Sequence, residues 1–181
     1  MSEQMSQTPD LAAEIADLTA RRDITDAVQR YMRGLDRLDA PLQRSAFHDD
    51  AWVDVGLFQG GASDFVAFAQ DLLAGFDGTH HFLGQVRIEI KGETASGECY
   101  FQAWHGARDS DGSPRDLFIS GRYVDEYARR NGEWRIAMRK LLTDWISDDP
   151  ANHAFYADNP NTNRGERRGK DFSQTRAWPD G

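Results

Sequence analysis

The sequence predicts an α+β fold, with helices from the first half of the chain packed on one face of a curved, mixed or antiparallel sheet from the second half. Three observations predict it. Apolar residues recur at steps of three and four before residue 78, and they alternate with polar residues after it. The dipeptide Asn131-Gly132, a strong signal for a β-hairpin, separates two of the alternating segments.

The first predicted helix starts at Leu11, after a polar N-terminus of residues 1–10 that we expect to be frayed. Thr8 and Pro9 suit a helix cap and a first-turn proline. The apolar positions of this helix recur mostly at helical steps: Leu11, Ile15, Leu18, Ile24, Val28, Tyr31 and Leu35.

Two shorter helices and one short strand complete the first half. The second helix is predicted over 40–48, and a strand or hairpin over 51–58 ends at a Gly-Gly pair. Ser63 is the predicted cap of the third helix. Its apolar face consists of Phe65, Phe68, Leu72 and Phe76.

Alternating residues after residue 78 predict four strands. They cover residues 86–90, 98–107, 117–129 and 133–145. In the second of them, Phe101 and His105 fall on one side and Trp104 on the other. A sheet that curls around the helices leaves a pocket between the two layers, and inward-pointing rings would line it.

Composition narrows the classes of partner. The chain has 181 residues and a formal net charge of −9, which disfavours binding to nucleic acid. No apolar run is long enough to span a bilayer, and residues 1–9 lack the pattern of a signal peptide. The single cysteine, Cys99, excludes an internal disulfide framework. We therefore expect a cytoplasmic protein that binds neither nucleic acid nor membranes.

The C-terminal stretch 148–181 differs from the body, 11–147. Its many Asp, Asn, Pro and Arg residues are typical of a disordered tail, but its rings are not. The rings are Phe155, Tyr156, Phe172 and Trp178. We expect an arm that packs on the body or on a neighbouring subunit, either as a lid over the pocket or as an intersubunit contact.

Several kinds of chemistry have little support. No Gly-x-Ser-x-Gly elbow or glycine-rich phosphate loop is present. Cys99 lies in the middle of a predicted strand, where cysteine is usually a small core residue. His48 and Asp50 have the spacing of an iron-binding His-x-Asp, but no partner histidine is marked by its spacing. We expect no metal site.

Tyr31, Asp36 and His81 form the best catalytic candidate, with His105 and Arg122 in support. Each also has a structural explanation: Tyr31 continues an apolar stripe, Asp36 could be a surface acid, and His81 could be merely exposed. Tyr31 and Asp36 lie about 140° apart on an ideal helix. They reach one pocket only if the helix bends or ends near Gly34.

Motifs along the chain resemble the SnoaL-like branch of the nuclear transport factor 2-like superfamily. The motifs are Tyr31-Met-Arg-Gly-Leu-Asp36, Phe47-His-Asp-Asp-Ala51-Trp52, Thr79-His80-His81-Phe82, Gly121-Arg122-Tyr123 and Asp144-Trp145. The resemblance covers about residues 11–147. It implies a cone-shaped α+β barrel with a deep apolar pocket. In dehydratase-like members, a helix-1 aspartate pairs with a histidine that acts as a base, and Asp36 and His81 match these positions.

The resemblance implies a cofactor-independent lyase or isomerase. Its substrate would be a hydrophobic, hydroxylated, aromatic small molecule, converted by dehydration or by retro-aldol-type C–C cleavage with release of formaldehyde. Tyr31 could polarise a carbonyl or hydroxyl group. Trp52, Phe65, Phe68, Phe101 and Trp104 could form pocket walls, although ordinary core packing would also explain these rings.

The resemblance also allows other functions. The fold also serves non-catalytic binding and assembly modules and the small subunits of ring-hydroxylating oxygenases. A homodimer or homotrimer is expected, because proteins of this fold often associate through the sheet.

Overall fold

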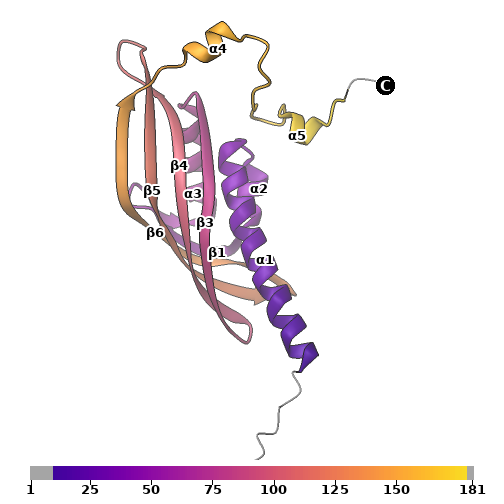
Figure 1. The fold of residues 1–181 in the computed structure, drawn as a ribbon. Coiled ribbons are helices and arrows are strands. Elements are labelled where there is room, and N and C mark those ends of the chain that lie inside the picture. Colours follow the sequence, from indigo (N-terminus) through magenta and orange to yellow (C-terminus); the bar gives the residue numbers. More distant parts are fainter. Residues whose placement is uncertain (1–9, 179–181) are drawn as a thin grey trace, which may run out of the picture.

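The computed structural model describes residues 10–178 (Figure 1). The predicted cap at Thr8 and Pro9 lies outside this range. Helix α1 (Leu11–Asp36) is capped by Asp10, whose side chain accepts hydrogen bonds from the backbone N–H groups of Ala12 and Ala13. The first part of its predicted stripe is not core, because Leu11, Ile15 and Leu18 are exposed. The buried face of α1 begins at Ala20.

The end of α1 packs closely on the short helix α2 (Ala40–Ser45). A Cβ atom at Gly34 would lie 2.5 Å from the backbone nitrogen of Gln43, so only glycine allows this approach. The helix continues through Gly34 and ends two residues later, at Asp36, so the expected end near Gly34 is confirmed. Asp36 therefore projects from the end of the helix.

The segment after α2 differs from its prediction at two boundaries. Strand β1 (Phe47–Asp54) begins at Phe47, so His48 belongs to a strand and not to the end of a helix. Strand β2 (Gln59–Gly61) leads directly into α3 (Ala62–Ala74). The N-cap of α3 is Gly61, and the prediction that Ser63 caps this helix is wrong.

Four long strands form most of the sheet: β3 (Gly78–Lys91), β4 (Thr94–Arg108), β5 (Pro114–Arg130) and β6 (Glu133–Pro150). The strand order is β2-β1-β6-β5-β4-β3, and all neighbours are antiparallel except β1 and β6. Asn131 and Gly132 turn the chain between β5 and β6, both with positive φ (54° and 84°), as the hairpin signal predicted.

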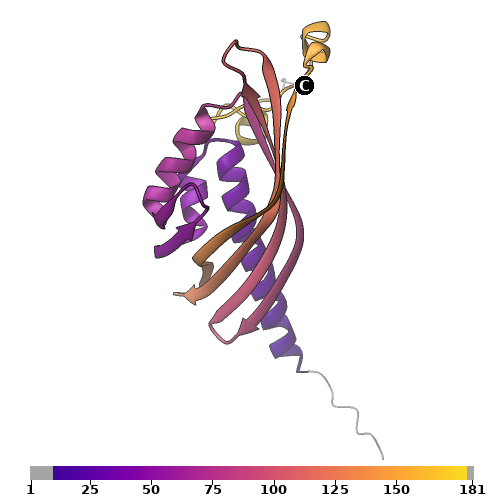
Figure 2. The same ribbon diagram turned by 90° about the vertical axis from the view of Figure 1, so that its left-hand side faces the viewer.

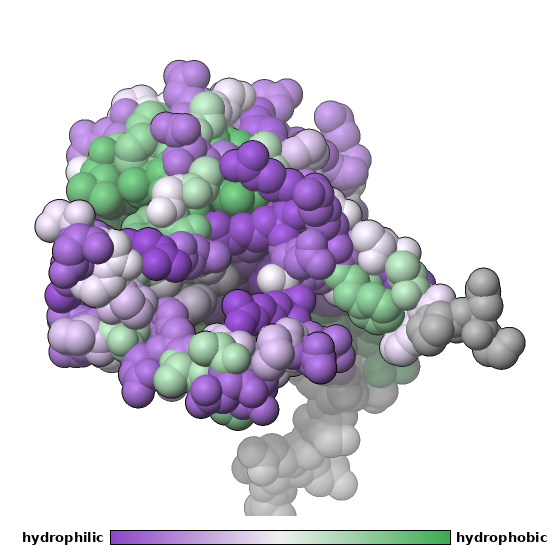
Figure 3. Space-filling view, turned by 90° about the horizontal axis from the view of Figure 1, so that it is seen from above, coloured by the Kyte–Doolittle hydropathy of each residue, from purple (hydrophilic) through white to green (hydrophobic). Residues whose placement is uncertain are grey.

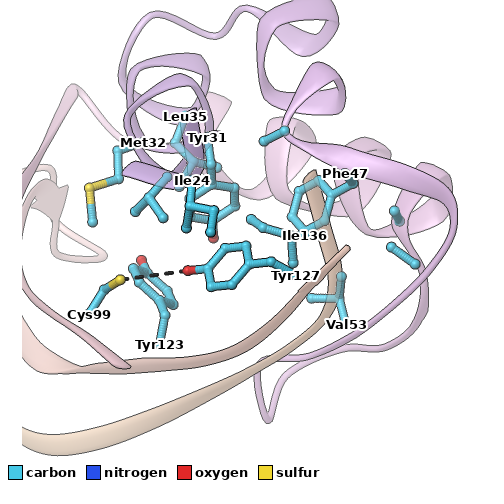
Figure 4. Close-up of a cluster of buried hydrophobic side chains, with 14 of the residues drawn as sticks. Ile24, Tyr31, Met32, Leu35, Phe47, Val53, Cys99, Tyr123, Tyr127 and Ile136 are labelled. Carbon is cyan, nitrogen blue, oxygen red and sulfur yellow. Dashed lines mark hydrogen bonds between the residues drawn. The ribbon is translucent and has the colours of Figure 1, made fainter. Parts of the chain in front are cut away.

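The sheet is strongly curved but open, and the three N-terminal helices lie on its concave side (Figure 2). This arrangement confirms the predicted α+β class and the predicted curved sheet. The layers enclose a core rich in rings (Figure 4). Tyr31 of α1 contacts Phe47, Phe65 and Tyr123, with ring centroids 5.5–6.2 Å apart. Aromatic rings thus fill space that aliphatic side chains occupy in most domains.

The C-terminal stretch contains two short helices, α4 (Ala154–Asp158) and α5 (Phe172–Thr175). It leaves the sheet at the end of β6 and returns across the end of α1, where Arg37 contacts Asp171. Phe155 and Trp178 remain largely exposed. Among the described residues, no helix is both long and apolar enough to cross a membrane.

Candidate active site

Asp36 and His81 form a buried pair. The Oδ1 atom of Asp36 lies 2.7 Å from Nδ1 of His81, and Oδ2 accepts the backbone N–H of His81 at 2.9 Å. Thr79 adds a third hydrogen bond, from its hydroxyl to Oδ1 at 3.1 Å. The side chains of His81 and Asp36 are only 6% and 9% exposed. Strand β3 therefore holds the carboxylate through two of its residues, two positions apart on one face.

The pairing determines the state of the imidazole. An ionised carboxylate can only accept hydrogen bonds, so the proton in the contact belongs to Nδ1 of His81. The other ring nitrogen, Nε2, then has a free lone pair in the neutral imidazole. This is the arrangement of a general base whose conjugate acid is stabilised by a fixed carboxylate.

His81 lines a cavity of about 390 Å³ between the sheet and α3. Most of the wall is apolar and comes from α1, α3 and the strands β4, β5 and β6. The polar groups among the lining residues are Tyr31, His81, His105, Tyr123 and Thr143. The view from the α4 end of the molecule shows hydrophobic surface gathered on one side (Figure 3), and the lining residues Leu57, Leu72 and Ile146 are themselves exposed. The cavity is therefore an apolar site with few polar groups.

His105 of β4 lies edge-on to His81, with 5.5 Å between ring centroids, and it packs against Phe76 at 5.1 Å. Burial lowers the pKa of His105 to about 4, and nearby His81 contributes to the shift. Its Nδ1 atom is buried and has no hydrogen-bond partner among the described residues. His105 is accordingly neutral near pH 7, beside the proposed base.

Replacing His105 by phenylalanine should change how stability depends on pH. The unfolded chain protonates this residue near pH 6.5, whereas the folded protein resists protonation until about pH 4. The contribution of the neutral His105 to the free energy of unfolding is complete above pH 6.5. It is lost as the pH falls, by about 3 kcal/mol on approaching pH 4. Urea unfolding would measure the free energy of unfolding at about pH 7 and about pH 4.5. The decrease between these two pH values should be smaller in His105→Phe than in the wild type. Equal losses in the two proteins would contradict a neutral His105.

Tyr31 lines the cavity but does not contact Asp36 in the described structure. The guanidinium of Arg139 lies 4.2 Å from the centres of the Tyr31 and Tyr123 rings. Burial raises the pKa of Tyr31, and Arg139 partly offsets this effect. Tyr31 thus stays protonated and can donate a hydrogen bond.

Sequence reasoning missed Arg139 and Asp125, which form a fully buried ion pair behind the two tyrosines. The contacts are 2.8 Å from Nε to Oδ1 and 2.6 Å from Nη2 to Oδ2. Regular counting from the Asn131-Gly132 turn pairs Asp125 with Met138, but an irregularity after Glu126 moves its partner to Arg139. The opposite charges on two neighbouring strands were the available signal, and the bulge concealed it.

The structure separates the predicted pocket residues into two sets. Phe65, Phe68, Phe101 and His105 line the cavity. Trp52, Trp104 and Arg122 do not, and the prediction that they face the pocket is wrong. The register of the sheet explains the positions of Trp104 and Arg122.

Arg122 and Trp104 lie on the outer face, because the inward residues of β4 and β5 are the odd-numbered ones. Arg122 pairs there with Glu98 at 2.7 Å and Asp144 at 3.1 Å. Trp104 donates its ring N–H to Asp116 at 2.6 Å. Alternation alone gives two equivalent faces and cannot identify the inner one.

Three other residues from the sequence analysis lie in the fold without lining the cavity. Trp52 is 49% exposed on β1. His48 is buried, and its Nε2 atom lies 2.8 Å from the carbonyl oxygen of Ala128. Cys99 is in the core, where burial raises the pKa of its thiol to about 11. A thiol with this pKa is a poor nucleophile near neutral pH.

Comparison with protein families gives a match to the SnoaL-like domain over residues 16–140. No match was found among curated proteins. Similar solved structures include a hexachlorocyclohexane dehydrochlorinase, LinA-type3, from Novosphingobium barchaimii LL02, with 18% identity, a TM-score of 0.69, and coverage of 77% of this chain and 97% of that one.

Two further structures share the fold. The Kfla4162 protein of Kribbella flavida is 22% identical, with a TM-score of 0.66 and coverage of 72% of this chain and 95% of that chain. A scytalone-dehydratase-like protein of Novosphingobium aromaticivorans DSM 12444 is also 22% identical, with a TM-score of 0.65 and coverage of 75% and 91%. At these identities the likeness concerns the fold.

Proposed function

Because the chain belongs to the SnoaL-like domain family, we propose that it is a cofactor-independent lyase or isomerase that works by acid-base catalysis. The observation that carries the proposal is the 2.7 Å contact between Asp36 and His81 at the wall of an apolar cavity. A non-catalytic binding or assembly module has no need of a buried, oriented imidazole. A small subunit of a ring-hydroxylating oxygenase has no need of one either.

The first chemical step is removal of a proton from the substrate by Nε2 of His81. Asp36 holds the ring in the required tautomer and stabilises the imidazolium that forms. Such a positioned base contributes about 10²–10⁴-fold to the rate. Tyr31, protonated at the cavity wall, donates a hydrogen bond to the oxygen on which negative charge develops.

The cavity favours a hydrophobic substrate that carries a few hydroxyl or carbonyl groups. Aromatic side chains supply much of the wall, including Phe65, Phe68 and Phe101, and a flat ring packs well against such surfaces. The polar groups among the lining residues, such as Tyr31 and Thr143, can bind a substrate hydroxyl. The proposed substrate class is therefore a hydroxylated aromatic small molecule.

Two reactions can begin with proton transfer to His81, and they differ in the substrate atom that loses the proton. In a dehydration, His81 removes a proton from carbon, the C–H electron pair forms a C=C bond, and the hydroxyl group on the adjacent carbon leaves as water with the proton that the imidazolium returns. In a retro-aldol reaction, His81 removes a proton from a hydroxyl group, the adjacent C–C bond breaks with release of an aldehyde that can be formaldehyde, and the imidazolium returns the proton to the carbon that keeps the electron pair. The dehydrochlorinase and the scytalone-dehydratase-like protein among the similar structures carry names of elimination enzymes, which supports an elimination.

The outer face of the sheet supports the proposal of a homodimer or homotrimer. The side chains of Phe82, Tyr100, Phe118 and Val124 lie on this face and are at least 40% exposed. Apolar side chains gathered on one face commonly mark an interface.

A screen of hydroxylated aromatic compounds by mass spectrometry tests the proposed reaction. We expect the wild-type protein to convert at least one compound to a product that lacks water or formaldehyde, or to an isomer. The same compound should persist with His81→Ala. Conversion at equal rates by both proteins would refute the role of His81, and stable binding without conversion across the screen would favour a binding module.

A further inference from the structure

The C-terminal segment 165–171 is fastened to the end of α1, although the family match stops at residue 140. The backbone N–H of Arg168 donates to the carbonyl oxygen of Arg37 at 2.8 Å. In return, Nη1 of Arg37 donates to the carbonyl oxygen of Glu166 at 3.0 Å and to Asp171 at 3.2 Å. Asp171 is itself buried. These contacts hold the segment directly beside Asp36, the last residue of α1.

Arg167 of this segment extends its side chain toward the beginning of β3. Its Nη1 atom donates to the carbonyl oxygens of Leu73 and Phe76, each at 3.0 Å. Its Nη2 atom lies 3.1 Å from the hydroxyl oxygen of Thr79. The guanidinium thus satisfies carbonyl groups at the end of α3 and, with its other nitrogen, binds the hydroxyl that contacts Asp36.

Hydrogen bonds link Arg167 to Thr79 and Thr79 to Asp36. The donors and acceptors available in these groups determine the direction of each bond. A guanidinium has no acceptor, so Arg167 donates and the Thr79 oxygen accepts. The single hydroxyl proton of Thr79 must then point elsewhere, and Oδ1 of Asp36 lies 3.1 Å away. Without Arg167, that hydroxyl is freer to rotate and to donate to another acceptor. Arg167, bound to the Thr79 oxygen, therefore stabilises the orientation in which Thr79 donates to Asp36.

The charges around the hydrogen bonds from Arg167 through Thr79 to Asp36 are consistent with a role of Arg167 in positioning Asp36. The charged side chains that act on Arg167 include Asp36, Arg37, Asp77 and Arg168. Burial lowers the pKa of Arg167, and the carboxylate of Asp36 opposes this shift. The cation and the carboxylate are thus coupled across Thr79 in a partly desolvated region.

We propose that Arg167 is a positioning residue for the Asp36–His81 pair, acting through Thr79, so that the C-terminal segment completes the site. The proposal rests on the proposed function for its catalytic consequence. Its structural content, that Arg167 stabilises the contact between Asp36 and His81, can be tested without a substrate.

The test measures how fast the Nδ1 proton of His81 exchanges with water, by NMR of the full-length protein. Breaking a hydrogen bond to the charged carboxylate should make this contact open more often, which increases exchange about tenfold. We expect this increase in both Arg167→Met and Thr79→Val. The double variant should exchange no faster than either single variant, because both remove the same link.

Two matched variants serve as controls. Thr79→Ser retains the hydroxyl and should exchange like the wild type. Arg164→Met removes another arginine of the same arm, whose guanidinium stacks on Tyr156 at 4.0 Å, and should also leave exchange unchanged. Because Arg167→Met also removes the contacts with α3, Thr79→Val is the variant that separates positioning from attachment of the arm.

Unchanged exchange in Arg167→Met, or a double variant whose effect is the product of the two single effects, would overturn the proposal. With an established substrate, Arg167→Met should lower kcat by about 10–100-fold and change KM less. Failure of the proposed function would appear differently, as normal turnover by His81→Ala, and it would leave the exchange result unaffected.

Discussion

Replacing His81 by alanine is expected to lower kcat by about 100-fold or more while the fold remains intact. Among the residues that the structure describes, His81 is the one histidine at the cavity wall whose ring a carboxylate orients, and the variant loses it. Asp36→Asn should have a comparable effect, because the amide keeps the size of the side chain but cannot stabilise an imidazolium by charge. Initial rates on a substrate found by the screen provide the measurement.

The neighbouring His80 offers a matched control. It is exposed and pairs in the sheet with Trp104, on the face opposite the cavity. His80→Ala should therefore keep nearly normal kcat. Thermal melting of all three variants would show whether each remains folded. Near-normal kcat in both His81→Ala and Asp36→Asn would rule out the acid-base mechanism.

The second large effect concerns stability. Asp125→Asn should lower the free energy of unfolding by about 3–5 kcal/mol, because it leaves the cation of Arg139 buried without a counter-charge. Both side chains of this pair are fully buried, and the Tyr127 hydroxyl also donates to Asp125, at 2.8 Å. Urea unfolding near neutral pH would measure the loss.

An exposed ion pair on the same sheet provides the comparison. The Lys140 ammonium lies 3.0 Å from Asp54, and the Lys140 side chain is 62% exposed. Lys140→Met should change stability by less than about 1 kcal/mol. The double variant Asp125→Leu/Arg139→Met should lose less than the sum of its single variants, since no unpaired charge remains. A loss below about 1 kcal/mol in Asp125→Asn would show that the cation is not effectively buried.

Much of the fold could be predicted from local patterns. The change of period near residue 78 located the transition from helices to long strands, and Asn131-Gly132 located the β5–β6 turn. The boundaries around β1 were missed. The polar run His48-Asp49-Asp50 lies inside that strand, where two of its three residues are exposed. Exposed strand positions carry no periodic signal of their own.

The site was predictable only in part. The resemblance to a family indicated the proximity of Asp36 and His81, which periodicity could not have done across 45 residues. Arg122 was misplaced because alternation does not distinguish the two faces of a sheet. Arg139 was missed because a bulge shifts its register, and Arg167 because nothing in the sequence of the arm indicates where it folds back. Each omission reflects tertiary geometry.

The parallel pairing of β1 with β6 has a consequence for folding kinetics. Phe47 pairs with Ile136, so β1 cannot complete its hydrogen bonds until nearly the whole body has left the ribosome. The hairpins of β3 to β6 can form from local contacts, whereas this closure joins distant segments and carries a large loop entropy. During synthesis, the first helices and β1 therefore expose apolar surface until β6 has been made. The nascent chain is most vulnerable to aggregation in this interval.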